Sequence, residues 1–173
     1  YTGRARSYLI KAGIPYEEVA PNNAHYSAVV LPKAGRRMSM PTVELDSGAG
    51  IRDGAASIDH FEEQNRGRFG TGDASLEVLS RLFDVIGAEG LLRPAMHYRW
   101  NFDAENKDFI MYHFRALMPP GVDRDSGATM AANQMRDATV RFGVTAETTD
   151  VVEHLYDDLL FALDKHLSEF PYL

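Results

Sequence analysis

The segment from Met38 to Glu62 holds the residues whose types and order are most typical of a binding site. It reads as a strand led by Pro41, a tight turn at Asp46-Ser47-Gly48, a second short strand and a helix that begins after Asp53. Asp53 stands where an N-cap belongs. A helix start offers main-chain N–H groups that bind anions. We therefore predict a small anion site made of main-chain amides at the start of this helix.

A second group of chemically useful side chains lies between Arg93 and Phe102. This stretch contains Met96, His97 and Trp100, the only tryptophan of the chain. A stripe of Met and aromatic residues either packs in a core or lines an apolar pocket, and the residues alone leave both interpretations open. His60 and His97 are not spaced with a carboxylate partner as a metal pair, so we predict no metal site.

The composition excludes several classes of function. Eighteen Lys and Arg residues against 25 Asp and Glu residues give a formal charge of −7, which argues against a nucleic-acid surface. The chain has no cysteine, which excludes disulfides, thiolate metal sites and cysteine redox chemistry from the residues present. This fits a reducing compartment, and a periplasm nearly as well. No apolar run approaches the ~18 residues of a membrane helix, so we expect a cytoplasmic protein without a membrane partner.

The first part of the chain, residues 1–66, is predicted to mix helix and strand. Helical spacing of apolar residues predicts a helix over 3–12 that stops at Gly13. The segment Ile14–Val19 reads as an edge strand, where a proline removes no ladder hydrogen bond. Residues 21–35 are polar and predict a loop with one short helix. The glycine-rich, basic residues 66–73 predict a linker.

The remainder, residues 74–173, is predicted to be an antiparallel helical bundle. Apolar residues at three- and four-residue spacing predict a helix that starts near Leu76 and runs toward Phe102. Further helices are expected over 103–117 and 126–142, and a long helix begins near Thr145. The composition and patterning therefore predict a mixed first part and an all-helical second part.

This order of elements resembles the glutathione transferase family. Residues 1–9 resemble the start of that family's first helix, with its Arg-x-Arg pattern. Residues 40–43, Met-Pro-Thr-Val, resemble the family's cis-proline turn, and residues 51–62 resemble its acidic helix start. The resemblance implies a thioredoxin-like α/β domain over residues 1–66, followed by the helical domain over residues 74–173. It also implies that a central strand precedes Tyr1 and that a further helix follows Leu173.

The resemblance places the catalytic group outside the sequence. In the family, a Tyr, Ser or Cys after the first strand lowers the pKa of the glutathione thiol, so that the nucleophilic thiolate exists at neutral pH. That residue is expected just upstream of Tyr1. Tyr1 and Thr2 are the nearest hydroxyls and are the second choice, while an ordinary first helical turn is the alternative for both.

The resemblance also implies a glutathione site at Met40, Pro41, Asp53 and Gly54. Met40 would bind the cysteinyl part of glutathione through its main chain, before a cis Met40–Pro41 peptide bond. Asp53 would face the γ-glutamyl ammonium, and the following amides would face the α-carboxylate. The alternative for Asp53 is a plain N-cap. Gly54 departs from the family's Ser or Thr, which removes one hydroxyl bond at about 1 kcal/mol.

The implied function is that of a glutathione S-transferase-like protein that uses the glutathione thiolate on a small electrophile. Met96, His97 and Trp100 would line the pocket for this second substrate, and the protein would be a cytoplasmic homodimer. Glutathione would be the cosubstrate. One alternative is a catalytically silent binding or assembly module, for which Gly54 is an argument. Another, a peroxide or disulfide oxidoreductase, requires a cysteine upstream of Tyr1.

Overall fold

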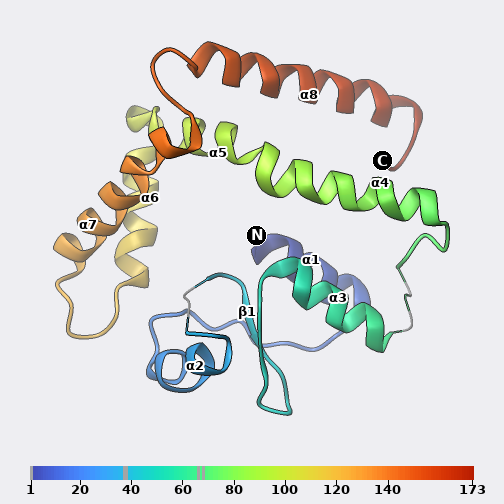
Figure 1. Cartoon of the computed structure of the whole chain (residues 1–173). Helices are drawn as coiled ribbons and strands as arrows, with labels where there is room; N and C mark the ends of the chain where they lie inside the picture. Colours follow the sequence, from blue (N-terminus) through green and yellow to red (C-terminus); the bar gives the residue numbers. More distant parts are fainter. Residues whose placement is uncertain (1, 37–38, 66, 68) are drawn as a thin grey trace. The chain divides into compact units, whose positions relative to one another are not determined.

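The computed structural model describes residues 2–36, 39–65, 67 and 69–173. The chain divides into two compact units. Unit 1 comprises Tyr1–Leu79 and Pro119–Val122, and unit 2 comprises Ser80–Met118 and Asp123–Leu173. Figure 1 labels the α-helices and strand β1.

Unit 1 begins with helix α1, Thr2–Ala12, which buries Ala5 and Leu9 on one face. The helix ends at Gly13, whose φ of +69° is the left-handed conformation that glycine adopts readily. The predicted helix over 3–12 and its glycine stop are therefore confirmed. A π-helical turn, η1 (Tyr26–Val30), and a single turn of α-helix, α2 (Leu31–Lys33), follow.

A hairpin and helix α3 complete the part of unit 1 that matters for the predicted site. Strands β1, Thr42–Glu44, and β2, Gly50–Arg52, pair antiparallel with Thr42 opposite Arg52. Gly48 forms the predicted turn at φ +78°. Helix α3, Gly54–Gln64, follows Asp53 and lies beside α1 (Figure 1). The predicted strand, turn, strand and helix are all present.

The prediction of a thioredoxin-like α/β domain is wrong. Among the described residues, β1 and β2 are the only strands, and the protein is mainly all-α. The segment Ile14–Val19 forms no strand. Pro15 cannot donate to a ladder, and Tyr16 and Val19 are 43% and 59% exposed, so little apolar burial holds this segment against a sheet. The composition of this segment is typical of a strand, but no neighbouring strand is present to pair with it among the described residues.

All the regular elements described in unit 2 are helices. The helix predicted to run from near Leu76 toward Phe102 is interrupted, because the five residues Ile86–Gly90 form a π-helical turn. The helix predicted over 103–117 has the predicted bounds, and the one predicted over 126–142 ends in a turn of 3₁₀ helix before Gly143. From the linker onward the elements are α4 (Ala74–Val85), η2 (Ile86–Gly90), α5 (Leu92–Trp100), α6 (Asp103–Leu117), α7 (Arg124–Asp137), η3 (Thr139–Phe142) and α8 (Thr149–Glu169).

The core of unit 2 forms where α5, α6 and α7 meet. Met96 and Trp100 of α5 pack with Ile110 of α6 and Ala132 of α7. Helices α6 and α7 lie side by side as a hairpin (Figure 1), and α8 packs on α5. In the described part of the chain, no helix combines the length and the apolar character needed to cross a membrane.

Candidate functional site

The hairpin brings the four predicted glutathione residues to one edge of unit 1. Because Thr42 pairs with Arg52, Pro41 and Asp53 are the next residues in register. The Asp53 N–H donates to the Pro41 carbonyl oxygen at 3.1 Å. The Met40–Pro41 peptide bond is cis, as predicted, and the Met40 side chain is 50% exposed. The proline-led strand and the start of α3 are therefore in direct contact.

Asp53 caps the helix that it precedes. Its Oδ1 accepts hydrogen bonds from the N–H groups of Ala55 at 2.7 Å and Ala56 at 3.4 Å. The capping role weighed in the sequence analysis is thus confirmed. It also uses two of the amides that the predicted anion site needs. Gly54, the first residue of the helix, is buried, and its N–H has no acceptor among the described residues.

The backbone of Asp53 has an unusual conformation. Its φ of +87° and ψ of 144° lie in a region that only glycine occupies readily, and such a residue stores roughly 1–3 kcal/mol of strain. Three hydrogen bonds hold it: its own N–H to Pro41, and the Ser57 N–H at 3.1 Å and Ser57 Oγ at 2.7 Å, both to the Asp53 carbonyl oxygen. Ser57 is only 2% exposed. Ser57 was not among the predicted site residues.

Contacts from η1 and α2 hold the hairpin from its other end. Glu44 of β1 bonds the His25 ring at 2.6 Å and the Lys33 ammonium at 3.5 Å. The hydrogen bond from His25, followed by the charges of His25 and Lys33, keeps the pKa of Glu44 below its ordinary value. A Cβ on Gly50 would lie 3.1 Å from the Ala34 main-chain nitrogen, so glycine permits this close approach. The strands that position Pro41 and Asp53 are thus anchored.

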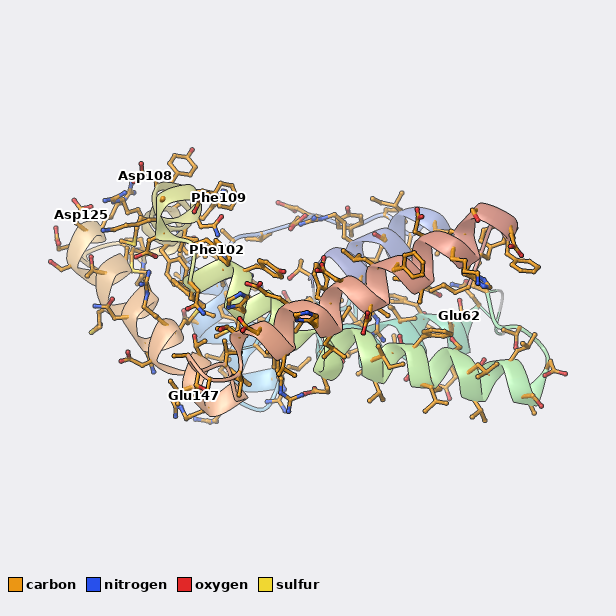
Figure 2. The ribbon with its side chains drawn as sticks, turned by 90° about the horizontal axis from the view of Figure 1, so that it is seen from above. Glu62, Phe102, Asp108, Phe109, Asp125 and Glu147 are labelled. Atoms are coloured by element: carbon orange, nitrogen blue, oxygen red, sulfur yellow. The ribbon has the colours of Figure 1, made fainter. Side chains whose placement is uncertain are left out.

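Helix α1 is fixed to α3 through Glu62. The Glu62 carboxylate accepts a hydrogen bond from the Tyr8 hydroxyl at 2.5 Å and another from the Phe69 N–H at 3.1 Å. Figure 2 labels Glu62. Thr2 lies in the first turn of α1, and Tyr1 lies outside the described residues. A catalytic role for either hydroxyl stays a prediction.

The residues predicted to line a second-substrate pocket gather on α5 in unit 2. Met96 and Trp100 pack in the core cluster. His97 is 3% exposed, and its ring bonds Glu153 Oε1 at 2.7 Å and Asn101 Nδ2 at 2.8 Å. All three residues are buried. Their role as a pocket lining stays a prediction.

A surface depression elsewhere on the protein does not overlap the predicted site. A depression of about 880 Å³ lies along one face of α7, lined by residues such as Asp125, Thr129 and Asn133, and it is widely open to solvent. It contains none of the predicted site residues. No group of three or more His, Cys, Asp or Glu side chains in the described residues is arranged to hold a metal ion.

No family model, no curated protein and no solved structure matches this chain. The functional argument therefore depends on the geometry of the chain itself.

Proposed function

We propose that this cytoplasmic protein binds glutathione weakly at the edge formed by Met40 and the start of α3. We further propose that it uses the bound thiolate, in the manner of a glutathione transferase, on a small electrophile. The observation that carries the proposal is the backbone of Asp53, which keeps a φ of +87° where glycine would relieve strain. Strain of this kind clusters at ligand-binding sites, where the surrounding bonds fix it. The proposal depends on this local geometry and not on the overall fold.

Each part of glutathione has a group to meet at this edge. Met40 is half-exposed beside the cis peptide bond, and this exposure supports pairing of its main chain with the cysteinyl peptide. Asp53 Oδ1 caps the helix, while Oδ2 has no partner among the described residues and is available to the γ-glutamyl ammonium. The α-carboxylate is left with the Gly54 N–H, because Asp53 already bonds the next two amides. This division of the amides is our reason for proposing weak binding.

Transfer needs the thiol to ionise before it attacks. The thiolate sulfur forms a bond to an electrophilic carbon of the substrate, the leaving group departs with its electron pair, and the thiol proton passes to solvent. This conjugation needs no oxidant or metal.

A catalytically silent glutathione-binding module is the second candidate. It is supported by Gly54, which lacks the hydroxyl of the family pattern, and by the two amides that Asp53 occupies. Conjugation of glutathione with 1-chloro-2,4-dinitrobenzene, followed by the absorbance of the thioether, separates the two candidates. A transferase accelerates the reaction above the protein-free rate, and a silent module binds glutathione without accelerating it.

Calorimetric titration with glutathione tests binding. Asp53→Asn keeps the shape and the capping oxygen but removes the charge that pairs with the ammonium. A hydrogen bond between charged groups contributes about 1.5–3 kcal/mol, so we expect affinity to fall at least about tenfold. Gly54→Ser restores a hydroxyl and is expected to tighten binding several-fold.

Asp73→Asn is the matched control. Asp73 caps α4 as Asp53 caps α3, with its Oδ1 accepting from the Ser75 N–H at 2.9 Å and the Leu76 N–H at 3.0 Å. We expect this variant to bind glutathione like the unmodified protein. The absence of heat with millimolar glutathione, or equal losses in the two Asp→Asn variants, would contradict the proposal.

We also propose that the protein is a homodimer. The support is the apolar surface of α4 and η2, where Leu82, Phe83 and Ile86 are exposed. Exposed apolar groups of this kind are typical of interaction surfaces. Sedimentation equilibrium at micromolar concentration should give twice the chain mass, and Phe83→Lys should shift it toward the monomer. A monomer for the unmodified protein would contradict this proposal.

A further inference from the structure

Three aromatic rings, one from α5, one from α8 and one from the residue before α6, form one cluster on unit 2. The Tyr98 ring stacks on the Phe102 ring with centroids 5.6 Å apart. The centroid of the Tyr156 ring lies 5.4 Å from that of Tyr98. Phe102 immediately precedes α6 and is labelled in Figure 2. None of the three residues is fully buried. The cluster therefore presents aromatic surface to solvent, and the face of an aromatic ring attracts cations.

Two carboxylates of α8 stand beside these rings. Glu153 and Asp157 are four residues apart and so lie on the same side of the helix. Burial, followed by the charges of Glu153 and Asp157, raises the pKa of the Tyr98 hydroxyl. The geometry agrees with this placement. Glu153 bonds His97, whose ring centroid lies 5.0 Å from that of Tyr98, and Asp157 directly follows Tyr156. Among the described residues, no Lys or Arg forms an ion pair with either carboxylate.

Glu153 is held in place from inside the unit. The buried His97 bonds Glu153 Oε1 at 2.7 Å through Nε2, and the Asn101 amide nitrogen lies 2.8 Å from Nδ1. The two bonds hold the imidazole ring at both nitrogens, and the ring in turn orients the Glu153 carboxylate. The Glu153 side chain is 41% exposed, so the carboxylate is oriented and still reaches solvent.

We propose that Tyr98, Tyr156 and Glu153 form a binding site for a small organic cation of the quaternary ammonium class. A weakly hydrated cation gains from both the ring faces and the fixed carboxylate, and it relieves the repulsion between Glu153 and Asp157. A hard metal ion fits less well, because it needs several oxygen ligands. The site lies within unit 2 and is independent of the proposed glutathione site.

Calorimetric titration with choline and with 3,3-dimethylbutan-1-ol tests the proposal. The alcohol has the shape of choline but no charge, so ring contacts alone would bind both equally. We expect the protein to bind choline at least tenfold more tightly than the alcohol. Glu153→Gln, which keeps an oxygen for His97, should weaken choline binding at least tenfold, and Tyr156→Leu should weaken it several-fold.

Asp158→Asn is the control for general attraction to an acidic helix. Asp158 follows Tyr156 by two residues, so the helical repeat places it on a different side of α8. We expect less than a twofold change in choline affinity. Tyr156→Phe keeps the ring face and should bind choline normally, which separates the loss of the ring from any loss of folding in Tyr156→Leu. Equal affinity for choline and the alcohol, or equal losses in Glu153→Gln and Asp158→Asn, would overturn the proposal.

Discussion

The starts of α3 and α7 use the same capping residue in different backbones. Asp123 caps α7 in an ordinary extended conformation, with φ −61° and ψ 118°, whereas Asp53 caps α3 at φ +87°. Four residues later, Gly127 and Ser57 each donate a main-chain N–H to the carbonyl of the capping residue. Only Ser57 adds a side-chain bond, at 2.7 Å. A cap needs no strain to stabilise a helix, so the strain at Asp53 points to a second role.

The largest expected difference between the two starts follows removal of the capping side chain. Asp53→Ala leaves the N–H groups of Ala55 and Ala56 without their acceptor, and a lost cap lowers the free energy of unfolding by about 1–2 kcal/mol. Asp123→Ala should lower it by less, because Asp123 accepts from one main-chain N–H, that of Ser126, whereas Asp53 accepts from two. Urea denaturation of the two variants measures the difference. Equal losses would show that the second hydrogen bond at α3 adds nothing.

Removal of the anchoring hydroxyl at α3 is expected to have a smaller effect. Ser57→Ala deletes the Oγ bond to the Asp53 carbonyl but keeps the main-chain bond, so we expect a loss of about 0.5–1.5 kcal/mol in the free energy of unfolding. Ser75→Ala, in the exposed first turn of α4, is the control and should change stability by less than about 0.5 kcal/mol. The same urea titrations apply. A Ser57→Ala variant as stable as the control would remove the anchoring role.

The smallest effect is a pH dependence at the start of α7. The hydrogen bonds from Ser126 lower the pKa of Asp123 below its ordinary value of 3.8. The stabilisation is therefore present above that value and is lost as pH falls through the lower folded-state pKa. Unfolding experiments at pH 5 and pH 2.5 should show the stability advantage over Asp123→Ala shrinking at the lower pH. An advantage that is unchanged or larger at pH 2.5 would contradict this assignment.

Local elements of the fold were predictable because their signals are local. The turn before Gly48 and the helix over 103–117 follow from turn residues, apolar spacing and stop signals within a few positions. The prediction of a thioredoxin-like domain failed because it depended on strand pairing. A strand-like segment such as Ile14–Val19 becomes a strand only with a partner, and pairing is a long-range property that composition does not contain.

The candidate site also has features that the sequence predicted and features that it did not. Asp53 was predictable as an N-cap from its place before a helical pattern. Its positive φ was not, because hydrogen bonds to Pro41 and from Ser57 hold it, and these form only in the folded hairpin and helix. Met96 and Trp100 show the opposite case. Their types suited both a core and a pocket, and the structure packs them in the core cluster.

Asp53→Gly tests most directly whether the strain at this residue serves a ligand. Glycine at this position relieves roughly 1–3 kcal/mol of backbone strain. Two effects oppose this gain in the free energy of unfolding: loss of the cap costs a few tenths of a kcal/mol, and the greater entropy of the unfolded chain costs about 0.4–1 kcal/mol. Urea unfolding and glutathione titration are measured on the same preparation. We predict that the variant is as stable as the unmodified protein or up to about 2 kcal/mol more stable, and that its glutathione affinity falls at least about tenfold. A variant that gains stability and still binds glutathione with unchanged affinity would contradict the account.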